Sequence, residues 1–392
     1  MVAWLLSLIT LSAQDPLNEL TLGKNAKLAF YGFLRLDVLL DDSRPNHAQV
    51  IHSVRSEDPA APASIGAKKN DGDFTMHPRL TRFGIDFDGP TIEPLGDAKV
   101  TAKLEIDFYN LLPSGITSNS REFIRMRHAW LKLGWEHFAL YAGQWEDLIA
   151  PIFPIVNSDL VMWGARNLGD RRPQIRPEWT NGVFTVAAMI GLTGADDGQD
   201  LDADGVLDGE DSGLPTVQAR VGLSIDGWVE KQKTVVGVWG HWAEEEVATP
   251  IAGTEEFTSH AIGADLTLPL LNNLWLKGEI WMGQNLDDVR GGAFQGINSS
   301  TGQEIDAYGG WVELGWKPID VYAVTLGASF DNPDDEDLPG TGRDLNRILY
   351  LANRFTFGPV EIGADYLYWT TEYVSFGDGT DNRFNFFISY KF

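Results

Sequence analysis

Apolar and polar residues alternate along most of the chain with a period of two. In Val100–Phe108 every second side chain is apolar, and the side chains between them are polar or charged. The segment Phe384–Phe392 repeats this pattern, with Phe387 as the exception. Because side chains of a β-strand point alternately to opposite faces, these segments predict strands with one dry and one wet face. A transmembrane barrel with a water-filled interior offers both environments, but a soluble β-sandwich does so as well.

The lengths of the connections between these segments favour the barrel. Short connections such as Glu136-His137 and Asn272-Asn273 alternate with long ones such as Glu146–Arg172, Glu245–Glu256 and Asn285–Glu304. Short turns at one end and long loops at the other are typical of outer-membrane barrels. Trp and Tyr are frequent near the predicted strand ends, as at two membrane interfaces, although aromatic residues are common in strands generally.

The predicted fold is therefore all-β: a transmembrane antiparallel β-barrel over residues 14–392, with short periplasmic turns and long extracellular loops. It has about 16 strands, an even number as in single-chain bacterial barrels. The predicted strands are Leu28–Leu40, Arg79–Phe87, Ala98–Tyr109, Phe123–Trp135, Phe138–Trp145, Pro173–Trp179, Phe184–Leu192, Pro215–Ile225, Thr234–Glu244, Phe257–Leu268, Leu274–Gln284, Ile305–Trp316, Tyr322–Asp331, Asn346–Phe355, Val360–Tyr373 and Asn382–Phe392.

The composition narrows the classes of protein that fit this pattern. A net charge of −26 argues against nucleic-acid binding, which depends on basic surfaces that neutralise phosphates. The chain has no cysteine, which excludes disulfides and cysteine-based metal or redox sites. Beyond the N-terminus no stretch approaches the roughly 20 apolar residues of a spanning helix. A membrane protein of this composition would have to cross the bilayer with strands.

The chain begins with a short apolar stretch that ends in Leu11-Ser12-Ala13. An apolar core followed by small residues is typical of an export signal, so we expect a signal peptide over residues 1–13. No Lys or Arg precedes the apolar core, which indicates a truncated signal or a different start. The alternative is a buried N-terminal strand or helix. Export together with a barrel predicts a location in the bacterial outer membrane.

Arginine is concentrated in the first half of the chain. If the apolar residues of the second and fourth predicted strands face lipid, alternation turns Arg82, Arg125 and Arg127 into the lumen. Arg176 lies on the polar face of the sixth predicted strand. Fixed guanidinium charges on a pore wall favour anions, including carboxylates. The alternative is that these arginines form structural ion pairs with acidic residues such as Glu105 on neighbouring strands.

The connection Glu146–Arg172 is unusually apolar for a loop exposed to water. A loop packed against the inner wall of the barrel would bury these side chains. We therefore expect it to narrow the pore, with Glu146 and Asp147 facing the arginines. The alternative is that the loop packs at a contact between subunits.

The segment Asp200–Asp211 has the spacing of a 12-residue calcium loop. Gly205 at the sixth position allows the sharp turn. Position twelve is Asp rather than Glu and no flanking helices are evident, so we expect a structural Ca²⁺ in the external loop 193–214 and no EF-hand domain. The alternative is a solvated acidic loop, and no organic cofactor is expected. The oxygen ligands would come from Asp200, Asp202, Asp204, the carbonyl of Val206, Asp208 and Asp211.

The chain contains no P-loop, no H-E-x-x-H and no G-x-S-x-G nucleophile elbow. We therefore expect no enzymatic activity. The predicted function is that of a porin, which lets small polar solutes diffuse passively, with a preference for anions. One alternative is a barrel of another class, such as an outer-membrane hydrolase or an adhesin with no conducting lumen. Another is a secreted soluble β-protein.

Predicted strands two to six and their connections contain the stretches Arg82-Phe83-Gly84, Leu95-Gly96-Asp97, Arg127-His128-Ala129-Trp130, Ala142-Gly143-Gln144-Trp145 and Arg171-Arg172-Pro173-Gln174-Ile175-Arg176. These stretches resemble the DcaP-like trimeric outer-membrane porins. The C-terminal half is similar to that family only in general pattern.

This resemblance implies a homotrimer of 16-stranded barrels that prefers small negatively charged solutes such as dicarboxylates. Members of the family can carry an N-terminal periplasmic coiled coil. Here only about a dozen residues separate Ala13 from the first predicted strand, so trimer contacts are expected from barrel walls and loops. The pore arginines implied by the resemblance are Arg82, Arg125, Arg127, Arg171, Arg172 and Arg176.

Overall fold

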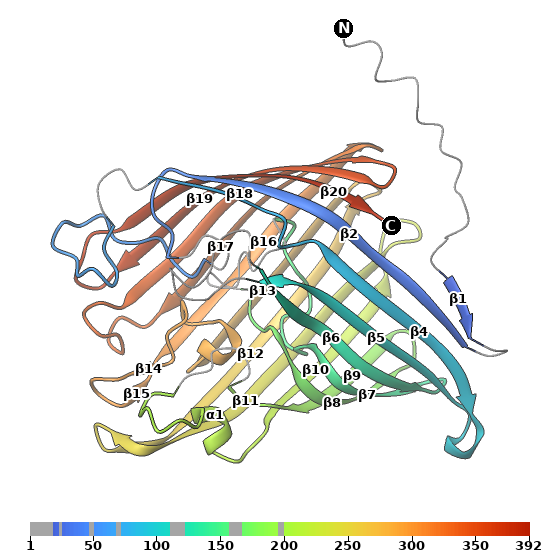
Figure 1. Cartoon of the computed structure of the whole chain (residues 1–392), viewed down its shortest axis with the longest axis horizontal. Helices are drawn as coiled ribbons and strands as arrows, with labels where there is room; N and C mark the ends of the chain where they lie inside the picture. Colours follow the sequence, from blue (N-terminus) through green and yellow to red (C-terminus); the bar gives the residue numbers. More distant parts are fainter. Residues whose placement is uncertain are drawn as a thin grey trace, which may run out of the picture.

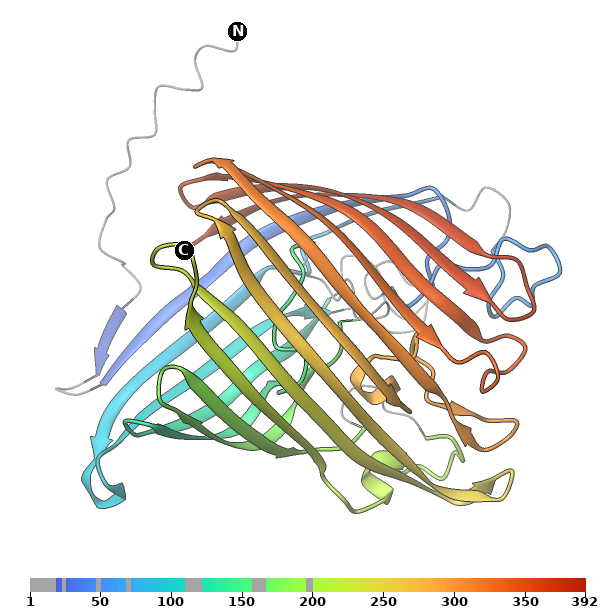
Figure 2. The same cartoon turned by 180° about the vertical axis from the view of Figure 1, so that it is seen from behind.

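The computed structural model describes residues 19–22, 26–46, 51–67, 72–109, 122–156, 167–194 and 200–392, and the structural statements below concern these residues. The expected signal peptide at residues 1–13 lies outside them. One antiparallel sheet closes on itself to form a barrel (Figures 1 and 2). In the described part of the chain, no helix is long and apolar enough to cross a membrane. The helical segments are Glu93–Leu95 (η1), Asp208–Asp211 (α1) and Asp287–Val289 (η3).

Sixteen strands of the described chain make the wall of the barrel, as the sequence predicts. The strand β2 closes the cylinder because it pairs with β4 on one side and with β20 on the other. The wall strands are β2 (Ala26–Asp41), β4 (Arg82–Ile92), β5 (Ala98–Tyr109), β6 (Phe123–Gly134), β7 (Phe138–Glu146), β8 (Arg171–Thr180), β9 (Phe184–Gly191), β10 (Thr216–Asp226), β11 (Lys233–Ile251), β12 (Thr254–Leu271), β13 (Leu274–Gln284), β16 (Asp306–Ile319), β17 (Tyr322–Pro333), β18 (Arg343–Phe357), β19 (Val360–Tyr373) and β20 (Gly379–Lys391).

Four short strands of the described chain are not among these sixteen. β1 (Glu19–Leu22) and β3 (Asp73–His77) both pair with β2. β14 (Ile297–Asn298) and β15 (Gln303–Glu304) form a small hairpin between β13 and β16. All four lie outside the predicted strands, because segments of two to five residues are too short for alternation to be recognised.

Side chains on the wall follow the predicted alternation. On β20, Phe384, Phe386 and Ile388 are exposed on the outside of the barrel, whereas Arg383 and Asn385 are buried on the inside. An outward apolar face and an inward polar face are what a barrel in lipid with a wet interior requires.

Phe387, the exception to the alternation, lies at an inward position. Its side chain is 4% exposed, and the guanidinium carbon of Arg35 lies 3.7 Å from the centre of its ring. The ring covers Gly363 of β19, where a Cβ atom would lie 1.9 Å from the Cε1 atom of Phe387. Glycine is therefore required at position 363 so that an aromatic ring can lie flat on the inner wall.

The structure corrects the expected external loop Glu245–Glu256. Strands β11 and β12 continue through most of this segment and meet at a tight turn, in which Ala252 and Gly253 have positive φ angles. Glu245 is 5% exposed and accepts a hydrogen bond of 2.9 Å from the side-chain amide of Asn285. Glu245 can remain buried in a strand because the side-chain amide of Asn285, distant in sequence, binds its carboxylate. The residues around Glu245 in the sequence give no indication of this partner.

An outward-facing apolar residue at mid-height should not tolerate a charge. Leu326 on β17 is 60% exposed and lies opposite Leu351 of β18. Leu326→Arg should lower the free energy of unfolding by about 2–4 kcal/mol, because the guanidinium would lie in hydrocarbon. Val321→Arg, in the turn before β17, should cost about 0–1 kcal/mol. Denaturant titration in lipid vesicles measures both changes in the free energy of unfolding. Equal losses for the two variants would contradict the placement of Leu326 in the middle of the hydrocarbon layer.

Candidate pore constriction and loop sites

The loop between β7 and β8 enters the barrel, as its apolar composition predicts. Its described parts are residues 147–156 and 167–170. Side chains on the inner faces of β10, β13 and β16 accept hydrogen bonds from its backbone, so the loop runs along the inner wall and occupies part of the lumen. The pairs are Leu148 N with Gln218 Oε1 (2.7 Å), Ile152 N with Glu279 Oε1 (3.1 Å) and Ile155 N with Glu313 Oε2 (2.7 Å).

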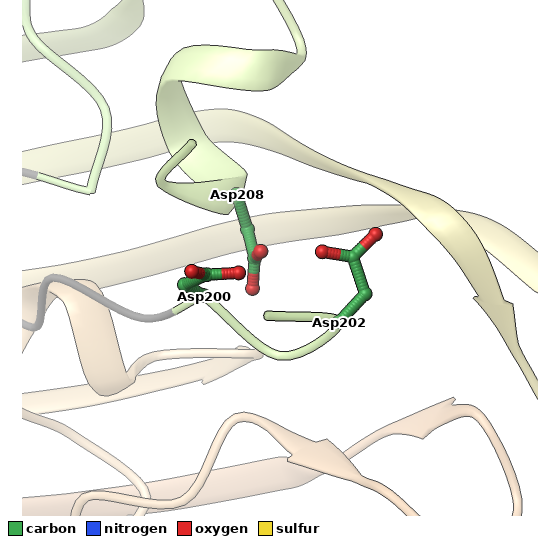
Figure 3. Close-up of side chains that lie close together, drawn as sticks. All are labelled: Asp200, Asp202 and Asp208. Atoms are coloured by element: carbon green, nitrogen blue, oxygen red, sulfur yellow. The ribbon is translucent and has the colours of Figure 1, made fainter. Parts of the chain in front are cut away.

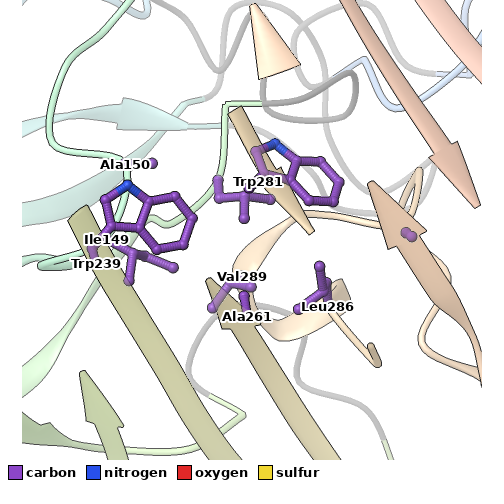
Figure 4. Close-up of a cluster of buried hydrophobic side chains, with 9 residues drawn as sticks. Ile149, Ala150, Trp239, Ala261, Trp281, Leu286 and Val289 are labelled. Atoms are coloured by element: carbon purple, nitrogen blue, oxygen red, sulfur yellow. The ribbon is translucent and has the colours of Figure 1, made fainter. Parts of the chain in front are cut away.

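Apolar side chains of this loop pack against tryptophans that point into the barrel. Ile149 and Ala150 belong to a buried cluster with Trp239 of β11 and Trp281 of β13 (Figure 4). A second buried cluster holds Val156 against side chains of β16, β18 and β19. Full burial of a large apolar side chain contributes on the order of 1.5–3 kcal/mol, so these contacts hold the loop against the wall.

A second loop, residues 285–305 between β13 and β16, also enters the barrel, whereas the sequence predicts an external loop there. Leu286 and Val289 belong to the cluster in Figure 4. The N–H group of Gly169 donates a hydrogen bond of 2.8 Å to the carbonyl of Val289, and Arg290 forms an ion pair with Asp170. The two loops therefore pack on each other. The signal that could have revealed this is the apolar content of the loop, which includes Leu286, Val289 and Phe294.

Arg172 does not line the pore, and this corrects the expectation from the family resemblance. Its side chain is 0% exposed. The guanidinium donates to Asp147 of the first inward loop (2.6 Å), to Asp288 of the second (2.8 Å) and to the carbonyl of Leu192 (2.8 Å). Asp147 was likewise expected to face the pore arginines but is buried at the base of its loop. Both residues lie away from water because two loops converge on them.

Arg82 of β4 and Arg125 and Arg127 of β6 gather against two carboxylates of β5. Arg125 donates two hydrogen bonds of 2.7 Å to Asp107. Arg127 donates to Glu105 (2.8 Å) and to Asp107 (3.3 Å). Arg82 lies 3.5 Å from Glu105 and 3.8 Å from Asp107. Three guanidinium groups thus share two carboxylates. The arginines expected in the lumen do lie together, and they also form the ion pairs that the alternative interpretation expected.

Arg171 and Glu146 lie at facing ends of β8 and β7. Arg171 Nη2 is 2.8 Å from Asp170 Oδ1, and its Nη1 is 4.0 Å from Glu146 Oε1. Burial would raise the pKa of the Asp170 carboxyl, but the positive charges of Arg171 and Arg290 outweigh burial and lower this pKa to about 2. Asp170 is therefore ionised at neutral pH and binds both arginines.

Arg176 lies closer to the periplasmic end of β8, beside aromatic side chains. Its guanidinium carbon is 4.4 Å from the ring centre of Trp145, and its Nη2 is 3.4 Å from Glu178 Oε2. A cavity of about 140 Å³ lies between Trp145, Arg176 and loop residues that include Pro151 and Phe153. The inward loop therefore leaves a small space beside this cation.

The external loop between β9 and β10 brings together three of the five carboxylates expected to bind Ca²⁺. Oxygens of Asp200, Asp202 and Asp208 all lie within 4.8 Å of one another (Figure 3). Gly205 has a φ of 95°, a left-handed conformation that favours glycine. These hard oxygen donors are of the kind that Ca²⁺ prefers.

The other two carboxylates are not part of this group. Asp204 accepts a hydrogen bond of 2.8 Å from the N–H group of Val206, and Asp211 lies at the end of α1. The loop also contacts the barrel, because Asp202 accepts a hydrogen bond of 2.6 Å from the N–H group of Thr249 on β11. The sequence motif thus predicted the turn and three neighbouring oxygens.

No protein-family model and no curated protein matches the chain. Solved structures do. The outer membrane channel DcaP of Acinetobacter baumannii has a TM-score of 0.73 at 16% identity, with 96% of this chain and 100% of that chain covered. The anion-selective porin from Comamonas acidovorans has a TM-score of 0.58 at 11% identity, with 94% and 100% covered. The trimer form of OmpT of Vibrio cholerae has a TM-score of 0.57 at 12% identity, with 94% and 100% covered. The chain has the porin fold.

At these identities the likeness establishes the fold alone. It confirms the 16-stranded barrel expected from the resemblance to the DcaP-like porins. A porin fold whose outward face is apolar supports a location in the bacterial outer membrane, as the sequence predicts.

Within this porin fold, removal of the Arg172 guanidinium should destabilise the packing of the inward loops. Arg172→Leu leaves Asp147 and Asp288 buried without this cation, and breaking a buried ion pair costs about 3–5 kcal/mol. The matched control Arg44→Leu removes an exposed pair with Asp73 and should cost about 0–1 kcal/mol. Denaturant titration of the refolded barrel measures both losses. A loss below about 1 kcal/mol for Arg172→Leu would mean that other contacts hold the loops.

Proposed function

We propose that this chain is a porin that lets small polar solutes diffuse passively, with a preference for small anions such as carboxylates. One observation carries the proposal. Beside the inward loops, the guanidinium groups of Arg82, Arg125 and Arg127 gather on the carboxylates of Glu105 and Asp107. Counted over these five side chains, three positive charges face two negative ones.

A single excess charge can bias the passage of ions through a narrow lumen. Guanidinium groups remain protonated over the accessible pH range, so the charge is permanent. Two unit charges 4 Å apart interact by about 1 kcal/mol in bulk water and by about 4 kcal/mol near a protein surface. Salt screens charges beyond about 8 Å at physiological ionic strength. The preference for anions should therefore increase in dilute salt.

Arg171 and Arg176 extend the group of arginines along the lumen in this proposal. Arg171 lies beside Asp170, which also binds Arg290, and beside Glu146, whereas Arg176 pairs with Glu178, so neither adds a full excess charge. Arg176 lies beside the 140 Å³ cavity, where a carboxylate could bind to its remaining guanidinium donors.

We also infer that the barrels assemble as a homotrimer surrounded by outer-membrane lipid. The solved structure of OmpT from Vibrio cholerae in a trimer form supports this assembly, as does the resemblance to trimeric porins. Homo-oligomers commonly have closed rotational symmetry, which a trimer satisfies.

Transport is favoured over the alternative of a hydrolase or an adhesin. The solved structures similar to the chain include an outer membrane channel and an anion-selective porin, which supports a channel over an enzyme. An adhesin with a plugged lumen would carry no current across a planar bilayer, so conductance separates these classes.

Arg82→Gln should weaken the preference for anions. It removes one positive charge and leaves the hydrogen-bonded pairs of Arg125 and Arg127 in place. A unit charge about 4 Å from a passing ion is worth about 1 kcal/mol in water, favourable for an anion and unfavourable for a cation, so the ratio of anion to cation permeability should fall by up to about thirtyfold. The reversal potential of a planar bilayer in a KCl gradient measures this ratio.

Two controls accompany this measurement. Asp86→Asn removes a half-exposed carboxylate of β4 beside Lys103 and should raise the same ratio. Arg44→Gln changes an exposed loop arginine and should leave the ratio unchanged. A parent protein that prefers cations would contradict the selectivity, and a parent without conductance would contradict the channel itself.

We further propose that the loop around Asp200, Asp202 and Asp208 binds a structural Ca²⁺. Three carboxylates within 4.8 Å repel one another, and a divalent cation between them would relieve that repulsion. Because Asp202 also contacts Thr249 of β11, a bound ion would fix the loop against the barrel.

The double variant Asp200→Asn, Asp202→Asn should abolish calcium binding. We expect the parent to bind Ca²⁺ with a Kd on the order of 10⁻⁴–10⁻³ M, as extracellular modules do. Titration calorimetry measures the affinity, and limited proteolysis near residues 200–211 tests whether Ca²⁺ protects the loop. Asp334→Asn, in another external loop, is the control. The proposal fails if the parent shows neither heat of binding nor protection.

A further inference from the structure

The outer wall carries a groove that the pore does not use. It has a volume of about 500 Å³, in the range of small-molecule sites, and lies across β13, β16, β17, β18 and β19. Gly310 and Ala328 line it and leave a hollow among larger apolar side chains. These outward side chains are Ile280, Val312, Phe330, Leu349 and Tyr368, which are 38–67% exposed.

Strand register places one cation in this groove. Residues directly opposite each other on paired strands point to the same face. Phe330 lies opposite both Gly310 and Arg347, so Arg347 belongs to the same outward row. Its side chain is 54% exposed. Glu279 is the other charged residue among the described residues that line the groove, but its side chain is 2% exposed and points into the barrel.

The height of Arg347 on the wall places it at the outer edge of the apolar band. It lies ten residues before Phe357, the last residue of β18 at the periplasmic end. A strand rises about 3.4 Å per residue, and barrel strands tilt by about 35–45°. Arg347 is therefore about 24–28 Å above that end, whereas the apolar band of such barrels is about 25 Å tall. The guanidinium thus lies at the level of lipid headgroups, with the groove beside and below it.

An exposed guanidinium above an apolar groove fits a lipid that carries a phosphate. Guanidinium has five N–H donors and binds phosphate through paired hydrogen bonds. Arg347 forms an ion pair of 2.9 Å with the partly exposed Glu372, and a pair this accessible to solvent contributes only about 0–1 kcal/mol. A phosphate can share or replace that pair.

We propose that this groove binds a phosphorylated lipid of the outer leaflet, with an acyl chain over Gly310 and Ala328 and a phosphate at Arg347. The ligand chemistry combines one hydrocarbon chain with one anionic headgroup. Arg347 supplies the positive charge and Glu372 competes with the lipid phosphate for it.

Native mass spectrometry of the full-length protein in detergent, titrated with diphosphoryl lipid A, tests whether the positive charge of Arg347 binds the lipid phosphate. Arg347→Gln should weaken binding by about tenfold or more, the effect of losing a charge-assisted hydrogen bond. Glu372→Gln should strengthen binding because it removes the competing carboxylate. Lipid A without its phosphates should bind the parent weakly and should not respond to either variant.

Two matched substitutions by phenylalanine test whether the hollow of the groove is needed for lipid binding. Ala328→Phe fills the hollow and should weaken binding with Arg347 intact. Leu326→Phe lies on the same strand but outside the groove lining and should leave binding unchanged. Because these residues face away from the lumen, all variants should keep the parent's single-channel conductance, which separates this proposal from the porin function.

Three outcomes would overturn the proposal. One is equal binding of lipid A by the parent and by Arg347→Gln. Another is equal binding of lipid A and its phosphate-free form by the parent. The third is conversion of the trimer into monomers by Ala328→Phe, because the groove would then be a contact between copies of the chain.

Discussion

A backbone N–H or C=O group cannot face hydrocarbon without a hydrogen-bond partner, and this constraint underlies the whole structure. The chain meets it by closing its sheet, since Phe33–Leu40 of β2 pair with β20 while the N-terminal half of the strand pairs with β4. Closure leaves the side chains as the only groups that meet lipid. Their alternation then determines that Phe384 and Ile388 are outside and that Arg383 is inside.

The loops inside the barrel must also find hydrogen-bond partners for their backbone N–H and C=O groups. The loop between β7 and β8 can lie inside because Gln218, Glu279 and Glu313 accept hydrogen bonds from its backbone. Arg172 then links this loop to the loop 285–305 through Asp147 and Asp288. A buried cation between two buried carboxylates is favourable only when all three remain paired, so the two loops hold each other in position.

Charge is distributed unevenly between the parts of the molecule. The acidic residues that dominate the net charge lie partly in external loops, whereas arginines are paired with carboxylates along the inner wall. The three arginines around Glu105 and Asp107 are few beside the total charge of −26. Selectivity in the proposed channel therefore depends on local geometry in the lumen, and net charge governs only the long-range field.

The sequence by itself determined the barrel, the number of wall strands and the inward apolar loop, because period-two alternation and apolar content are local properties. It also indicated Gly205 and the aspartates around it. It could not determine that Arg172 is buried, that Glu245 lies in a strand or that Arg347 shares an outward row with Phe330. Each of these depends on residues distant in sequence, namely Asp288, Asn285 and the partner strand β17, and only closure of the barrel brings them together.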